Sequence, residues 1–103
     1  MTFKLKKLDK RYNGSNLFKF VAIPDRANVT AFMNYVVRRD QEQKEFTEVR
    51  NWCWSQWGPS SELRFYGDTK DWTNPVWCWD SEHDNLRIYF QSDKEASWFK
   101  LKW

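Results

Sequence analysis

The chain has 103 residues, of which 8 are Trp, 8 Phe and 4 Tyr, and its formal net charge is +3. The length predicts one domain over residues 1–103, and the aromatic content of 19% with interspersed charges excludes a disordered or low-complexity chain. No apolar stretch approaches the roughly 18 residues of a membrane-spanning helix, and no signal-peptide core follows the basic N-terminus. We therefore expect a cytosolic protein without a membrane partner.

The first expected elements are two strands, residues 3–12 and 17–23, joined by a turn at residues 13–16. This turn begins with Asn-Gly, a strong hairpin signal, because both residues tolerate a positive φ. Basic side chains crowd these strands. They form a candidate nucleic-acid-binding surface of Lys4, Lys6, Lys10, Arg11 and Lys19. Lysines on an edge strand also prevent aggregation, and the small net charge favours this second interpretation.

The middle of the chain predicts one helix clearly and another weakly. Residues 27–39 fit a helical stripe but are rich in β-branched side chains, so a strand is the alternative. From Asp40, which opens an expected capping box, apolar residues recur at helical spacing up to the expected cap at Gly58. The inward stripe consists of Phe46, Val49, Cys53 and Trp57. Trp54 flanks this stripe, and Trp52 lies on its other side, where we expect partial exposure.

The C-terminal half predicts three more strands and a short helix. The strands are expected at residues 62–66, 76–80 and 86–90. Residues 81–85 are rich in turn formers and join the last two strands in a hairpin. Ser92 and Glu95 form a second expected capping box that opens a helix, although residues 99–103 also alternate like a strand. The order predicts an α+β fold, an antiparallel sheet of four to five strands with two or three helices packed on it.

Three stretches resemble a class of small tailed-bacteriophage proteins of undefined function: LDKRYNGSNLFKF, EVRNWCWSQWGPSSEL and RIYFQSDKEASWFKLKW. The shared features are a W-C pair at a helix end closed by glycine and a terminal F-x-L-x-W. The resemblance implies a viral protein in the host cytoplasm. It implies no catalytic residues, because none is defined for the class.

No pattern in the chain predicts catalysis or metal binding. His83 stands among carboxylates in an expected loop, where a solvated side chain is a better interpretation than a general base. Cys53, Cys78 and this single histidine supply too few ligands for zinc, and we expect two buried free thiols, with a disulfide as the alternative. No nucleotide-binding or hydrolase motif occurs. We therefore expect no enzyme activity, no cofactor and no small-molecule substrate.

The main functional hypothesis depends on tryptophans that alternate along one expected strand. In a strand, Trp77 and Trp79 share one face and Cys78 lies on the other, so the chain either covers both faces or exposes rings. Exposed aromatic patches mark protein-binding surfaces, in which Trp, Tyr and Arg dominate. The candidate protein-binding residues are Trp52, Trp77, Trp79, Arg87 and Tyr89. A helix packed over the second face is the structural alternative.

These patterns favour a small non-enzymatic accessory protein that binds a protein partner, such as a host factor, or forms a homo-oligomer. The alternative is a single-stranded nucleic-acid-binding module, in which the basic N-terminal hairpin and stacking aromatic rings hold the strand.

Overall fold

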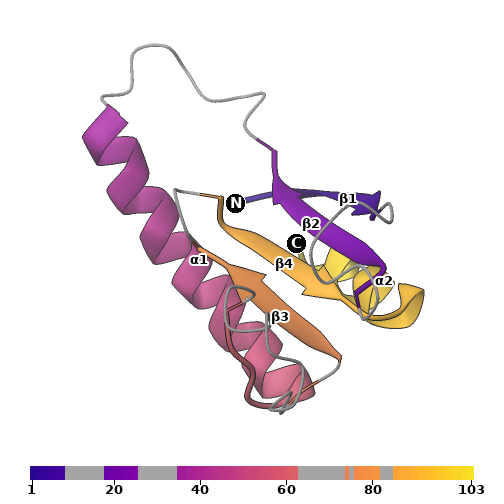
Figure 1. The fold of residues 1–103 in the computed structure, drawn as a ribbon. Helices are drawn as coiled ribbons and strands as arrows, with labels where there is room; N and C mark the ends of the chain where they lie inside the picture. Colours follow the sequence, from indigo (N-terminus) through magenta and orange to yellow (C-terminus); the bar gives the residue numbers. More distant parts are fainter. Residues whose placement is uncertain (9–17, 26–34, 63–73, 75, 82–84) are drawn as a thin grey trace.

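The computed structural model describes residues 1–8, 18–25, 35–62, 74, 76–81 and 85–103, without the side chains of 35–38. In chain order the elements are β1 (Phe3–Lys7), β2 (Phe20–Pro24), α1 (Tyr35–Trp57), β3 (Trp77–Asp80), β4 (Arg87–Phe90) and α2 (Asp93–Lys102). The strands form one antiparallel sheet in the order β1-β2-β4-β3. Helix α1 runs beside β3, and α2 packs against β1, β2 and β4 (Figure 1). The predicted α+β class with an antiparallel sheet is thus confirmed.

Within the described residues, β1 ends at Lys7 and β2 begins at Phe20, whereas the sequence pattern suggested strands over residues 3–12 and 17–23, of which 9–12 and 17 lie outside the described part. β1 pairs with β2 from Phe3 opposite Pro24 to Lys7 opposite Phe20, and the expected turn at residues 13–16 lies outside the described residues. β4 lies between β2 and β3, with Phe90 opposite both Phe20 and Trp77. Of the strand expected at 62–66, only Glu62 is described.

Helix α1 begins earlier than its expected capping box. Its backbone is already helical from Tyr35, so Asp40 is an exposed residue inside the helix, and the prediction that Asp40 caps it is wrong. A cap requires a non-helical backbone at the capping residue, and that condition is not met here. The predicted inward stripe is confirmed, because Phe46, Val49 and Cys53 are buried and Trp57 is half-buried. The remainder of the segment expected at 27–39 lies outside the described residues.

The end of α1 is fixed to the sheet by hydrogen bonds to its last carbonyls. Gly58 has a φ of +87°, and its N–H donates to the Trp54 carbonyl at 2.9 Å, so the predicted glycine cap is confirmed. The buried Asn74 side-chain amide donates to the carbonyls of Trp57 at 2.8 Å and Pro59 at 3.1 Å. The Trp77 indole N–H donates to the Gly58 carbonyl at 2.9 Å. The chain that leaves the helix is therefore held against β3.

Helix α2 closes the core by packing against β1, β2 and β4. Ser92 is the N-cap, but its hydroxyl donates to the Glu95 carboxylate and caps no backbone N–H. The helix continues to Lys102, so the alternative of a terminal strand is wrong. Phe99 is buried with its ring 5.2 Å from those of Phe3 and Phe90. Neither helix in the described part of the chain has the length and apolar character that a membrane span requires.

The rings beside Cys78 are buried on both faces of the sheet, which overturns the expected aromatic patch. On the helix-covered face Trp77 is fully buried and Trp79 is 8% exposed. On the opposite face Cys78 and Tyr89 are buried together with Phe18 and Val21. The prediction that Trp77, Trp79 and Tyr89 form an exposed surface is therefore wrong. Trp77 and Trp79 are buried because α1 packs over them, which is the alternative of a helix covering the second face.

Candidate functional site

The five sequence-predicted protein-binding residues do not form one surface. Besides the three buried rings, Arg87 is half-buried on the face of Tyr89, away from the helices. Burial raises the pKa of Tyr89, and a hydrogen bond with Arg87 partly offsets this effect. Trp52 is half-buried between the helices, with its ring edge-on to Trp57 at 5.6 Å and to Trp103 at 6.3 Å. The structure therefore places Arg87 and Trp52 on opposite faces of the sheet.

The two predicted basic residues within β1, Lys4 and Lys6, lie on the face that the helices do not cover. Lys4 and Lys6 are exposed on β1 and alternate with Phe3, whose ring points to α2. Lys19 is exposed just before β2, whereas Lys10 and Arg11 lie outside the described residues, as does His83. The rings described on this face belong to Phe18 and Tyr89, and both are buried. In the described part of the chain, the lysines thus have no exposed ring beside them on which a base could stack.

The two cysteines are free and buried on opposite faces of the sheet. Cys53 lies on the inward side of α1, against the helix-covered face of the sheet, and Cys78 lies on the other face with Tyr89. Burial raises the pKa of both thiols well above the usual value. The predicted free thiols are confirmed, and the sheet between them excludes a disulfide.

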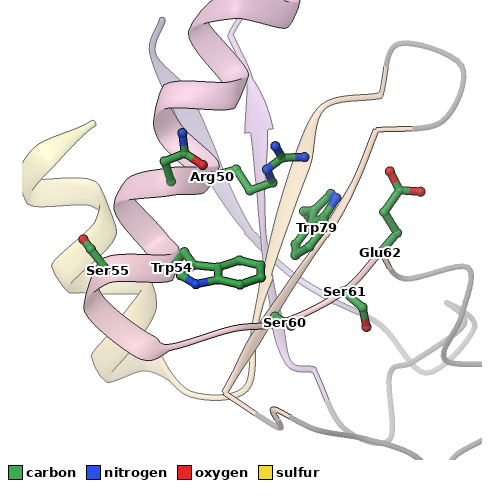
Figure 2. Close-up of a pocket in the computed structure, with 8 residues that line it drawn as sticks. Arg50, Trp54, Ser55, Ser60, Ser61, Glu62 and Trp79 are labelled. Atoms are coloured by element: carbon green, nitrogen blue, oxygen red, sulfur yellow. The ribbon is translucent and has the colours of Figure 1, made fainter.

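An open groove lies where α1 passes over the β3 edge of the sheet, and we call it the Trp79 groove (Figure 2). Its volume is about 700 Å³, within the usual size range of ligand-binding clefts. Trp79 forms the floor. The walls consist of Arg50, Asn51, Trp54 and Ser55 from α1 and of Ser60, Ser61 and Glu62 from the segment after the helix.

The floor of the groove presents a tryptophan with an unused hydrogen-bond donor. The Arg50 guanidinium lies 5.3 Å from the centre of the Trp79 ring, and the Trp54 ring is tilted at 6.3 Å from it. Figure 2 shows both side chains reaching from α1 toward Trp79. The Trp79 Nε1 atom is buried and has no acceptor among the described residues. An unpaired buried donor costs about 1–3 kcal/mol, so an acceptor supplied from outside would remove a penalty that the free protein carries.

The second wall is rigidly joined to β3. Glu62 forms an isolated parallel bridge with Trp79, whose N–H lies 3.5 Å from the Ser61 carbonyl. The Ser60 hydroxyl donates to the Trp77 carbonyl, and the Ser81 hydroxyl donates to the Glu62 carboxylate. Hydrogen bonds therefore join this wall to the floor of the groove in the absence of a ligand.

The described lining of the groove combines apolar, polar and charged side chains. Among the described residues, the charged lining consists of one cation, Arg50, and one anion, Glu62, so this part of the lining lacks the excess of positive charge that attracts a phosphate backbone. Of the described lining residues none is a histidine, lysine or cysteine that could serve its serines as a base or act as a nucleophile. Trp54 is 44% exposed and provides an apolar contact surface.

A second exposed apolar feature lies on α2, and we call Trp98 and Leu101 the α2 ridge. The two residues are 53% and 82% exposed and lie one turn apart, on the side of the helix opposite Ala96 and Phe99. The Trp98 indole N–H donates to the Gln56 side-chain oxygen of α1 at 3.1 Å. The large ring is thus held in one position with half of its surface in water.

Sequence reasoning placed neither surface, although a signal for each was present. Arg50 and Trp54 are four residues apart and lie off the inward stripe of α1. Trp98 and Leu101 are three residues apart and lie off the inward stripe of α2. The opposite wall of the groove could not be found, because it depends on how the chain returns to β3 after Gly58. Comparisons with protein-family models, curated proteins and solved structures find no match to this chain.

Proposed function

We propose that this is a non-enzymatic accessory protein that binds another protein, and that the Trp79 groove receives an extended segment of that partner. The observation that carries the proposal is a preformed groove in which Arg50 and the half-exposed Trp54 surround a tryptophan with an unpaired Nε1–H. Trp and Arg are the residue types that most often dominate protein-binding energy.

An extended peptide matches the groove chemically. Its backbone carbonyls are the acceptors that the Trp79 Nε1–H and the Arg50 guanidinium lack, and an apolar side chain can pack on Trp54. The Trp79 Nε1 atom is buried, so a carbonyl reaches it only after neighbouring side chains move. The half-buried Arg50 side chain lies over the Trp79 ring, and its rotation would leave the backbone of α1 in place.

The groove favours a protein over a nucleic acid. Its two described charges have opposite signs, and Glu62 would repel a phosphate. Lys4 and Lys6 are on β1, at the opposite end of the sheet from β3. A strand bound in the groove would therefore not reach these lysines through a continuous basic surface.

A peptide-display selection tests the proposal. Random peptides are selected on the folded full-length protein, and the enriched sequences are measured by fluorescence polarisation. We expect micromolar binding that weakens about tenfold or more in Arg50→Ala and Trp54→Ala, as for residues at the centre of an interface. Trp98→Ala is the matched control, since it removes another exposed indole outside the groove. No enrichment, or equal binding by all variants, would refute the proposal. Salt-dependent binding of labelled oligo(dT) that is lost in Trp54→Ala would support the nucleic-acid alternative instead.

A further inference from the structure

The α2 ridge is a second surface, separate from the groove, and charged side chains lie beside it. From the arrangement of these charges we infer that the ridge binds the ridge of a second copy of this chain, with the two α2 helices antiparallel about a two-fold axis. This inference goes beyond the proposed peptide binding and does not depend on it.

The ridge has a hollow at each of its two ends. The hollow toward the start of α2 has a volume of about 460 Å³ and includes Trp57, Lys94 and Glu95 in its lining. The hollow toward the end of the helix, about 270 Å³, includes Trp52 and Lys102. Both hollows share Trp98 and Leu101. The surface therefore alternates between projecting and recessed parts, as a self-complementary interface requires.

Among the charges beside the ridge, which include Lys94, the pair Glu95 and Lys102 favours an antiparallel pairing. Glu95 and Lys102 are seven residues apart, so they lie on the same side of α2 with a drift of about 20°. Trp98 lies close to the midpoint between them. When two copies meet at this midpoint with their helices antiparallel, Glu95 of each copy faces Lys102 of the other. A parallel arrangement puts Glu95 level with Glu95 and Lys102 level with Lys102, so it forms neither of these ion pairs.

The same arrangement accommodates the apolar side chains. Leu101 lies toward the end of α2, so in the antiparallel pair it faces the larger hollow of the second copy. The two Trp98 rings meet near the two-fold axis, where each is already positioned by Gln56. The interface contains two equivalent ion pairs and closes on itself, so assembly stops at a dimer.

Charge exchange on the full-length protein tests this inference by sedimentation equilibrium. From about 1 to 500 μM we expect mass to rise from monomer to dimer by mass action. Glu95→Lys and Lys102→Glu should each weaken dimerisation about tenfold or more, because each places like charges together twice. The double variant Glu95→Lys/Lys102→Glu should return to within about threefold of the original dissociation constant, since both pairs are restored with reversed sign.

Two controls separate assembly from folding and from peptide binding. Asp93→Lys makes the same charge change in the first turn of α2 but lies about 140° round the helix from Trp98, so it should leave the dimer intact. Leu101→Asp should give a monomer with an unchanged circular dichroism spectrum and unchanged peptide binding in the groove. A wild-type monomer over the whole range, a dimer insensitive to Leu101→Asp, or a double variant no tighter than the single variants would each overturn the inference.

Discussion

Asn74 is the residue whose substitution tests the account of the fold most directly. It is a buried polar side chain that donates to two carbonyls at the end of α1 and accepts the Val76 N–H at 2.9 Å. Replacement by alanine removes these three hydrogen bonds, at about 1 kcal/mol each, so Asn74→Ala should lower the free energy of unfolding by about 3 kcal/mol. At this chain length, the loss corresponds to a fall of about 12 °C in the melting temperature, measured by circular dichroism.

The isosteric variant Asn74→Asp separates the lost donors from the lost volume. It keeps the acceptor for Val76 but turns a buried carboxylate oxygen toward the carbonyls of Trp57 and Pro59. The folded protein should therefore hold the pKa of this carboxyl above the unfolded value of about 3.9. With a raised pKa, stability is retained below the unfolded value and lost as pH rises through the folded value.

Asn74→Asp should thus be less stable than Asn74→Ala at about pH 7 and should recover part of the difference at about pH 4, where the protonated acid can donate. An Asn74→Asp variant as stable as wild type at neutral pH, or one whose deficit does not shrink on acidification, would refute this reasoning. It would mean that the Asn74 amide does not hold the end of α1.

Two further predictions concern other parts of the same fold. Gly58→Ala should lower the free energy of unfolding in urea by about 1–2 kcal/mol because of the positive φ of Gly58, and Gly58→Asn should lower it less. The added Cβ would meet only Asn74 Nδ2, at 3.9 Å, so a steric clash does not contribute. An unchanged stability would therefore mean that the φ at this position is not constrained. Cys53 and Cys78 should resist thiol reagents until the protein unfolds, and rapid labelling of the native protein near neutral pH would contradict their burial. Burial raises the folded-state pKa of both thiols above 9.0, so the free energy of unfolding should fall as pH rises above that value.

The sequence predicted the elements because their periodicity is local. The pairs of apolar residues at 46 and 49 and at 96 and 99 recur at helical spacing, and Ile88 and Phe90 alternate as in a strand. The start of α1 was misplaced because Asp40 has the side chain of a cap but not its backbone, and only the preceding residues decide that. Local patterns therefore predicted which elements form more reliably than where they begin.

The exposure of the tryptophans could not be predicted in the same way. Alternation places Trp77 and Cys78 on opposite faces, but whether a face is covered depends on the path of α1 across the sheet. The same dependence explains why Trp54 is the more exposed of the two rings beside Cys53, although Trp52 was expected to be the open one. Trp52 is half-covered because α2 brings Phe99 and Trp103 against it.

The two proposed surfaces are compatible because α1 presents them in different directions. Cys53 points into the core, and with about 100° between successive residues Arg50 and Trp54 lie on one side of it and Trp52 and Gln56 on the other. The groove therefore opens along the β3 edge, whereas the α2 ridge contacts the far side of the same helix. A dimer formed through the ridge would leave both grooves open. A partner with two linked segments could then bind both at once and gain affinity from the raised effective concentration of the second.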